Sequence, residues 1–236
     1  MTATAPLILA ELEAVESERR SRAATPGLQA RVQAVKAYQQ ARFSHTYADL
    51  LAHRRYAGAA RFFLDELYGP GDFSQRDAQF ARVVPALVRL FPRDVVDTVW
   101  TLAKLHALSE QLDSEMGRRL PGDQADARSY AQAWRATGRA AERDEQVDLV
   151  MSVGASLDAL TRKPLLRQTL RMMHGPARAA GLSALQAFLE QGFDTFQAMR
   201  GASEFLDTVS ARERALALVL FDTSDAGERK ALGQLP

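Results

Sequence analysis

Apolar residues recur three and four positions apart along nearly the whole chain, and this spacing constrains the fold more than any other feature of the sequence. It gathers apolar side chains on one face of an α-helix, whereas a half-buried β-strand needs apolar and polar residues to alternate. Runs that alternate in this way are missing from the sequence. The pattern therefore predicts an all-α fold, a compact bundle of about seven to nine helices with no sheet.

The length and composition of the chain suffice for a substantial core. Its 236 residues are 47% hydrophobic and 25% charged, and a chain of this size can bury most of its apolar surface in one large or two small cores. A proline and glycine turn near residue 121 is the best candidate for a boundary within that core. The predicted parts are an N-terminal amphipathic helical arm at 1–22, an all-α core domain at 23–222 with possible halves 23–120 and 121–222, and a frayed C-terminal tail at 223–236.

Charge and composition disfavour several classes of partner. The 30 basic and 29 acidic residues leave a formal charge of +1, so no long-range field attracts nucleic acid or an anionic membrane. The longest wholly apolar run, Ala215–Phe221, falls far short of the roughly 20 residues that a membrane span needs. The absence of cysteine excludes disulfides and cysteine nucleophiles, and it favours a reducing compartment. We expect a cytoplasmic protein that binds neither nucleic acid nor membranes.

One stretch stands out because aromatic residues surround an acidic pair. It is Phe62-Phe63-Leu64-Asp65-Glu66-Leu67-Tyr68-Gly69, and it closely resembles the FFLEELY signature of a family of uncharacterised bacterial proteins. The resemblance implies a helical fold and a bacterial source, and it implies no particular reaction.

A predicted helix over residues 46–68 gives this motif a structural interpretation. At about 100° per residue, Phe63 faces the core, Asp65 points away from it, and Phe62 lies off the main face. We therefore interpret the motif as part of a core helix that the following Gly-Pro-Gly brings to an end. The alternative is a partner-binding surface built on Phe62, Asp65 and Glu66.

Extended backward, the same helix carries three possible metal ligands, His45, Asp49 and His53. The two histidines lie about 12 Å apart along a helix axis, so they cannot bind one ion together. Only His45 with Asp49, or Asp49 with His53, could do so. Two protein ligands do not make a specific zinc site, which usually takes three or four. We therefore predict no metal here.

A polar interruption in the long helix across the middle of the chain is the best candidate for chemistry. The apolar face that begins with Val95 and Val99 continues into His106, Glu110 and Asp113. Buried ionisable groups need partners, and without them their pKa values shift. One interpretation is a polar pocket in which His106 is a base or a ligand with Glu110 behind it. The other is that the face turns to solvent, or that arginines of other helices pair with the carboxylates.

Signatures of familiar enzymes are missing from the sequence. It has no phosphate-binding GxxxxGK[ST], no GxGxxG, no HExxH and no GxSxG. We predict no cofactor; a haem site with His106 or His174 as single axial ligand stays an open alternative.

These observations favour a non-catalytic binding or regulatory module that acts through protein or small-ligand contacts. We expect a protein partner or self-association as a homodimer, through the first helix or the aromatic-rich helix that contains Phe188 and Phe196, with a helix in a groove as the mode of contact. The alternative is a helical enzyme or ligand sensor with a pocket around His106, Glu110 and Asp113.

Overall fold

Helices account for most of the chain. The computed structural model describes residues 2–66 and 69–236. Its helices are α1 Ala5–Ala24, α2 Leu28–Thr46, α3 Ala48–Ala52, α4 Ala57–Glu66, α5 Ser74–Leu90, α6 Arg93–Arg119, α7 Ala127–Thr137, α8 Ala140–Thr161, α9 Pro164–Ala179, α10 Ser183–Met199, α11 Ser203–Phe221 and α12 Asp225–Leu232. No strand occurs in these described residues, so the predicted all-α class is confirmed.

The described residues form twelve helices, so the predicted number of seven to nine is wrong. The helix predicted over residues 46–68 is divided, because the backbone becomes extended at His53 and a turn follows before α4. In that turn the Tyr56 N–H donates to the His53 carbonyl oxygen at 3.0 Å. Two residues of the motif, Leu67 and Tyr68, lie outside the described residues.

Both ends of the chain pack on the bundle. In α1, Ile8 and Leu12 are buried in one apolar cluster with residues of α5 and α6, so this helix does not stand away from the core as the predicted arm would. Residues 223–236, predicted to fray, contain α12 instead, and Ala231 and Leu235 are buried there against α7 and α11. The reason is the same at both ends of the chain. The apolar face of the terminal helix packs against neighbouring helices, which shield it from water.

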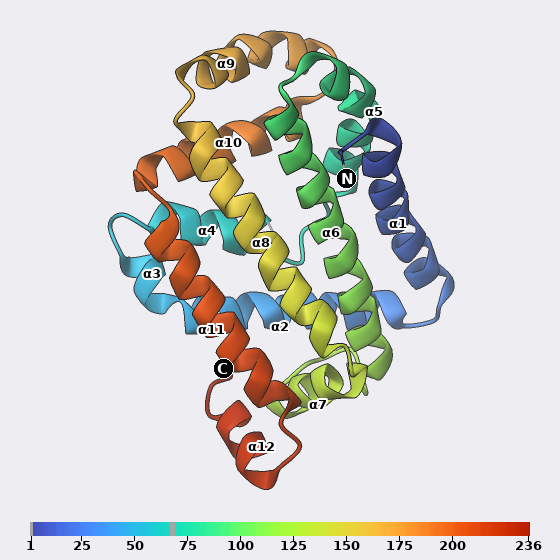
Figure 1. Ribbon diagram of the computed structural model, residues 1–236. Coiled ribbons are helices and arrows are strands. Elements are labelled where there is room, and N and C mark those ends of the chain that lie inside the picture. Colours follow the sequence, from blue (N-terminus) through green and yellow to red (C-terminus); the bar gives the residue numbers. More distant parts are fainter. Residues whose placement is uncertain (1, 67–68) are drawn as a thin grey trace.

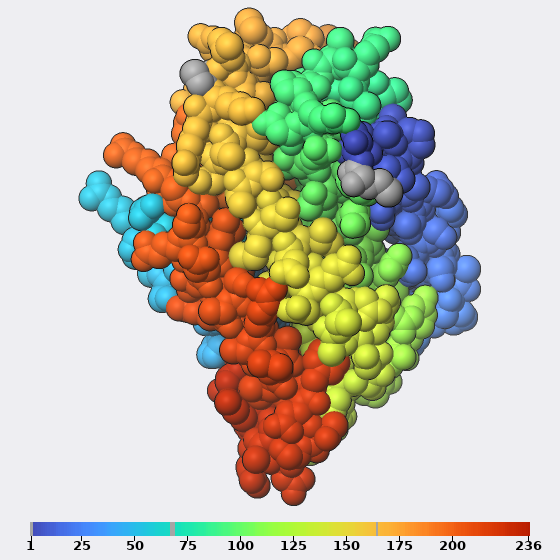
Figure 2. All heavy atoms as spheres, viewed as in Figure 1, coloured from blue at the N-terminus to red at the C-terminus, as the bar shows by residue number. Residues whose placement is uncertain are grey.

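The helices are arranged around a central pair. As Figure 1 shows, α6 and α8 run side by side, α1 lies along α6, and α11 lies along α8. Helices α5 and α9 lie near one end of the pair, and α4 and α10 pass behind it. In the space-filling view, α6, α8 and α11 are neighbours across one face (Figure 2). The helices on the two sides of residue 121 therefore pack directly against each other.

Local signals explain some helix ends but not all. At the start of α7 the Asp126 side chain accepts from the Ser129 N–H at 2.7 Å, and the Ser129 hydroxyl oxygen accepts from the Asp126 N–H at 2.9 Å. Gly138 ends this helix with a φ of 63°, which costs glycine little because it has no Cβ. By contrast, α9 continues through Gly175 and Pro176, although glycine and proline both disfavour the interior of a helix.

Within the described part of the chain, no helix combines the length and the apolar character needed to cross a membrane.

Candidate functional site

Helix α6 forms one wall of an interior chamber. Val95, Val99, Leu102, His106 and Glu110 follow one another at three- or four-residue intervals, and all of them line this space. The face predicted from the sequence is therefore continuous. The interpretation in which it turns to solvent halfway along the helix is wrong, because Glu110 is only 4% exposed.

The chamber is long and mainly apolar. It has a volume of about 300 Å³ and is bordered by α4, α5, α6, α8, α9 and α10. Its lining along α8 runs from Arg143 to Leu160, which is roughly 25 Å at 1.5 Å per residue. The phenylalanines of the lining are Phe62, Phe63, Phe73, Phe80, Phe91, Phe188, Phe193 and Phe196. A molecule held there would lie mostly among hydrocarbon and aromatic groups.

His106 is paired with a carboxylate from α5. Its Nε2 lies 2.8 Å from Asp77 Oδ2, and the same oxygen accepts from Arg19 Nη2 at 2.5 Å. Burial alone would raise the pKa of Asp77, but His106 and Arg19 more than offset it, and the pKa is lowered. Asp77 is therefore held as a carboxylate that joins α1, α5 and α6 at the chamber wall.

Glu110 forms a second, separate ionic cluster. Its two carboxylate oxygens lie 2.5 Å from Arg22 Nη1 and 2.5 Å from Lys36 Nζ, while Arg22 Nη2 also donates to the Glu110 carbonyl oxygen. Burial opposes ionisation here, yet Lys36 and Arg22 lower the pKa of Glu110 to about 2. The predicted alternative in which cations of other helices pair with this carboxylate thus describes Glu110 well.

Asp113, one turn further along α6, has a different environment. Gln39 Nε2 donates to Asp113 Oδ1 at 2.9 Å, and Lys36 Nζ lies 3.8 Å from Oδ2. Burial is the larger effect at this site, so the pKa of Asp113 is raised despite the charge of Lys36. The three predicted residues therefore line one chamber but belong to two groups, His106 with Asp77, and Glu110 with Asp113.

A row of polar side chains continues from α6 across α8 to α7. Gln146 Nε2 donates to Ser109 Oγ at 2.8 Å, and Arg143 Nη1 donates to Gln146 Oε1 at 3.0 Å. The Arg143 guanidinium lies over the Trp134 ring, 3.9 Å from its centroid. All four residues line the chamber. The polar face of α6 alone does not predict this polar row, because three of its members lie on helices other than α6.

Close to this row, a buried ion pair joins α2 to α11. Arg42 Nη1 and Nη2 donate to the Glu213 carboxylate at 2.9 and 3.0 Å, and the Tyr47 hydroxyl donates to it at 2.7 Å. Burial opposes ionisation of Glu213, but Arg42 and Tyr47 hold its pKa below the ordinary value. This end of the chamber is therefore rich in fixed charge, in contrast to the part lined by phenylalanines.

The residues proposed as a partner-binding surface do not form one exposed surface. Phe62 is 3% exposed and stacks on Phe188 of α10, with ring centroids 5.5 Å apart. Glu66 accepts from Arg76 Nη1 at 3.1 Å, whereas Asp65 is exposed. Since Phe62 is a wall of the chamber, it cannot serve as the apolar anchor of an external surface.

The three possible metal ligands have other neighbours. Both oxygens of Asp49 accept from Arg212 at 2.7 Å. His53 stacks on the Tyr56 ring and accepts from the Arg55 N–H at 3.2 Å, and His45 is exposed. The carboxylate common to the two pairings considered from the sequence is therefore engaged by Arg212 of α11.

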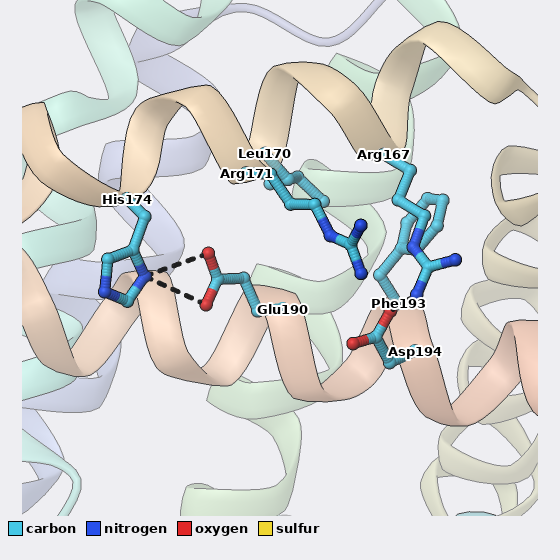
Figure 3. Close-up of a pocket in the computed structure, with 7 residues that line it drawn as sticks. All are labelled: Arg167, Leu170, Arg171, His174, Glu190, Phe193 and Asp194. Atoms are coloured by element: carbon cyan, nitrogen blue, oxygen red, sulfur yellow. Dashed lines mark hydrogen bonds and ion pairs between the residues drawn. The ribbon is translucent and has the colours of Figure 1, made fainter.

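A second pocket, of about 400 Å³, lies between α9 and α10. His174 Nδ1 lies 3.1 Å from both oxygens of Glu190, and Arg167 donates to Asp194 at 3.0 Å (Figure 3). Arg171 projects toward α10 between these two pairs. Most of the residues that line this pocket are charged or polar, and Leu170 and Phe193 provide its apolar surface. Because ligand pockets are lined mainly by apolar and aromatic side chains, this pocket is the weaker candidate site.

Comparison with known proteins assigns the chain to a family. A family model described as a domain of unknown function, DUF8198, matches residues 18–227. The chain belongs to this family. The DUF8198 match includes every residue that lines the chamber except Leu12 of α1. No curated protein and no solved structure matches the chain. The chamber and its side chains are therefore the main indication of function.

Proposed function

We propose that this protein is a non-catalytic binding protein that holds a small, mainly apolar molecule in the chamber. The chamber itself is the observation that carries the proposal. Ligand pockets have volumes of roughly 300–1,000 Å³ and combine apolar walls with a few polar groups, and a chamber of about 300 Å³ has both properties. Close-packed protein interiors contain few voids larger than a water molecule, so a space of this size between the described residues favours a bound molecule.

Titration with a small neutral fluorescent naphthylamine, 1-naphthylamine, tests the proposal. We expect one molecule bound per chain in the unmodified protein. In Val147→Trp, a bulkier side chain would occupy the chamber beside α8, so probe binding should fall at least about tenfold. The melting temperature should change little, because the added volume fills existing space, whereas overpacking of a dense core costs about 1–3 kcal/mol.

A matched control is Leu218→Trp. Leu218 is 76% exposed on α11 and does not line the chamber. This variant should bind the probe like the unmodified protein. Probe binding that is absent from all three proteins, or equal in all three, would contradict the proposal.

The second candidate is an enzyme, and the pair of His106 and Asp77 favours it. A histidine oriented by a carboxylate beside an apolar pocket is an arrangement that general base catalysis uses. Hydrolysis of a dodecanoyl ester of p-nitrophenol that disappears in His106→Gln would support an enzyme. Equal release of p-nitrophenol with and without the protein would leave the binding protein as the better account.

We also infer a setting for the protein. The cysteine-free sequence fits a reducing compartment, and the resemblance of the motif to a bacterial signature supports the bacterial cytoplasm. Self-association or a protein partner stays a prediction, which light scattering on the full chain would test by its mass.

A further inference from the structure

The chamber has two chemically distinct parts. The phenylalanines of α4, α5 and α10 surround one part, and the row of Ser109, Gln146, Arg143 and Trp134 borders the other. A molecule that fits both parts has one long apolar end and one polar end. This inference rests on the function proposed above, since it concerns the chemistry of the molecule that the chamber holds.

The dimensions favour a flexible chain. The hydrocarbon core of a bilayer is about 30 Å thick and holds two acyl chains end to end, so one chain needs about 15 Å. The chamber extends for roughly 25 Å along α8 by the helical rise. An apolar cavity of about 150 Å³ holds benzene, so a chamber of twice that volume takes on the order of a dozen carbon atoms. A chain of about twelve carbons therefore matches the volume and fits within the length.

The charges favour an anionic head group. Four cations gather around the polar part, and they are Arg22, Lys36, Arg42 and Arg143. Three carboxylates accompany them, Glu110, Asp113 and Glu213. The positive charge of Arg143 acts on both Asp113 and Glu213. One positive charge is thus in excess, and burial of Asp113 increases the excess because it favours the neutral acid.

A hydrogen-bond donor in the polar part of the chamber favours a ligand whose head group carries acceptor oxygens. Trp134 is 6% exposed and lines the chamber, and its Nε1–H has no acceptor among the described residues. A buried donor without an acceptor destabilises the folded protein, because it has lost its hydrogen bond to water. The oxygens of a ligand would remove this cost.

We propose that the ligand is a long-chain carboxylate of the fatty acid class, with its carboxylate beside Arg143, Gln146 and Trp134 and its chain among the phenylalanines. A carboxylate supplies two acceptor oxygens and the one negative charge that the polar part lacks. A primary alcohol of the same length offers a weaker acceptor and no charge. An alkylamine would add a cation to a site that already has an excess of them.

Displacement of the bound naphthylamine by three matched ligands tests the head group. The ligands are dodecanoate, dodecanol and dodecylamine. We expect dodecanoate to bind at least about tenfold more tightly than dodecanol, and dodecylamine to bind most weakly. If dodecanol or dodecylamine bound as tightly as dodecanoate, the assignment of a carboxylate head group would be wrong. The chamber would still be a binding site. Failure of the naphthylamine itself to bind would instead overturn the function on which this inference rests.

Trp134→Phe tests the position of the head group. It removes the N–H and keeps an aromatic ring, so dodecanoate affinity should fall about tenfold while dodecanol affinity stays unchanged. Trp100→Phe is the matched control, because the Nε1–H of Trp100 is likewise buried without an acceptor among the described residues, but Trp100 does not line the chamber. Equal effects of the two substitutions on dodecanoate binding would overturn the assigned position.

Discussion

Glu110 and Asp113 lie one turn apart on α6, but their surroundings change their acidity in opposite directions. Burial raises the pKa of Asp113, with the charge of Lys36 acting against it. Burial acts on Glu110 too, but the charges of Lys36 and Arg22 outweigh it and its pKa falls to about 2. Two carboxylates that look alike in the sequence should therefore respond differently to substitution.

Glu110→Gln should be strongly destabilising at neutral pH. The folded pKa of Glu110 is lowered from 4.5 to about 2, and a shift of one unit is worth about 1.4 kcal/mol, so we expect a loss of about 3 kcal/mol in the free energy of unfolding. Because the folded pKa is the lower one, this contribution is present above pH 4.5 and disappears as the pH falls toward 2. Urea unfolding at pH 7 and at pH 3 would measure both effects. The exposed pair of Glu13 and Arg20 provides the control, since Glu13→Gln should change little.

Asp113→Asn should be tolerated or stabilising. The folded pKa of Asp113 lies above its ordinary value of 3.8, so ionisation of this group disfavours the folded state as the pH rises from about 4. An asparagine oxygen can still accept from Gln39 without that cost. The variant should gain stability relative to the unmodified protein between pH 4 and pH 7, again by urea unfolding. A loss as large as that of Glu110→Gln would contradict this account.

At the residue scale, the sequence predicted the polar face of α6 but not its partners. Helical spacing brings His106 and Glu110 onto one face, because that relation is local. Arg22 and Lys36 are 88 and 74 positions away from Glu110, and no local pattern relates positions so far apart. Asp77, the partner of His106, is 29 positions away on α5, and no local pattern relates these two residues either.

At the scale of elements, close contact between α2 and α6 depends on Gly117. A Cβ atom added there would meet Val32 Cγ2 at 2.6 Å and Leu28 Cδ1 at 3.3 Å. Gly117→Ala should therefore destabilise the protein by about 1–3 kcal/mol through overpacking. In α9, Gly175→Ala meets no atom within 4 Å, so it should stabilise by about 0.5–1 kcal/mol through helix propensity alone. Thermal unfolding of the two variants should give shifts of opposite sign.

The first helix offers another test at this scale. Ile8 is completely buried against α5 and α6, so Ile8→Ala should cost about 2–5 kcal/mol. Chemical unfolding measures this, with Glu13→Ala on the exposed face of the same helix as control. A free energy of unfolding equal to that of the unmodified protein would mean that α1 is the free arm the sequence suggested.

Helix periodicity predicted the class of the fold, because amphipathic spacing is a local property. It could not predict that α1 and α12 pack on the core, since the faces that receive them belong to distant segments. It also placed one helix over residues 46–68, although the chain turns after α3 and brings Phe62 and Phe63 to face different neighbours. Only the assembled bundle shows that Phe62 lines an interior space.

At the scale of the whole molecule, the chamber is the feature that connects these observations. Apolar side chains of α5, α8 and α10 surround it, and ionic clusters that join α1, α2, α5 and α6 lie at its edge. These clusters fix the surrounding helices, while the side chains of the described residues leave the space between them unfilled. A bound molecule should therefore increase stability by mass action without a rearrangement of the helices.

A crystal structure of the protein grown with dodecanoate is the measurement that tests the account most directly. We predict one continuous chain of electron density between α6, α8 and α10, in contact with Phe62 and Phe188, and with its carboxylate beside Arg143. A chamber closed by repacked side chains, with dodecanoate absent or bound on the outer surface, would contradict the account.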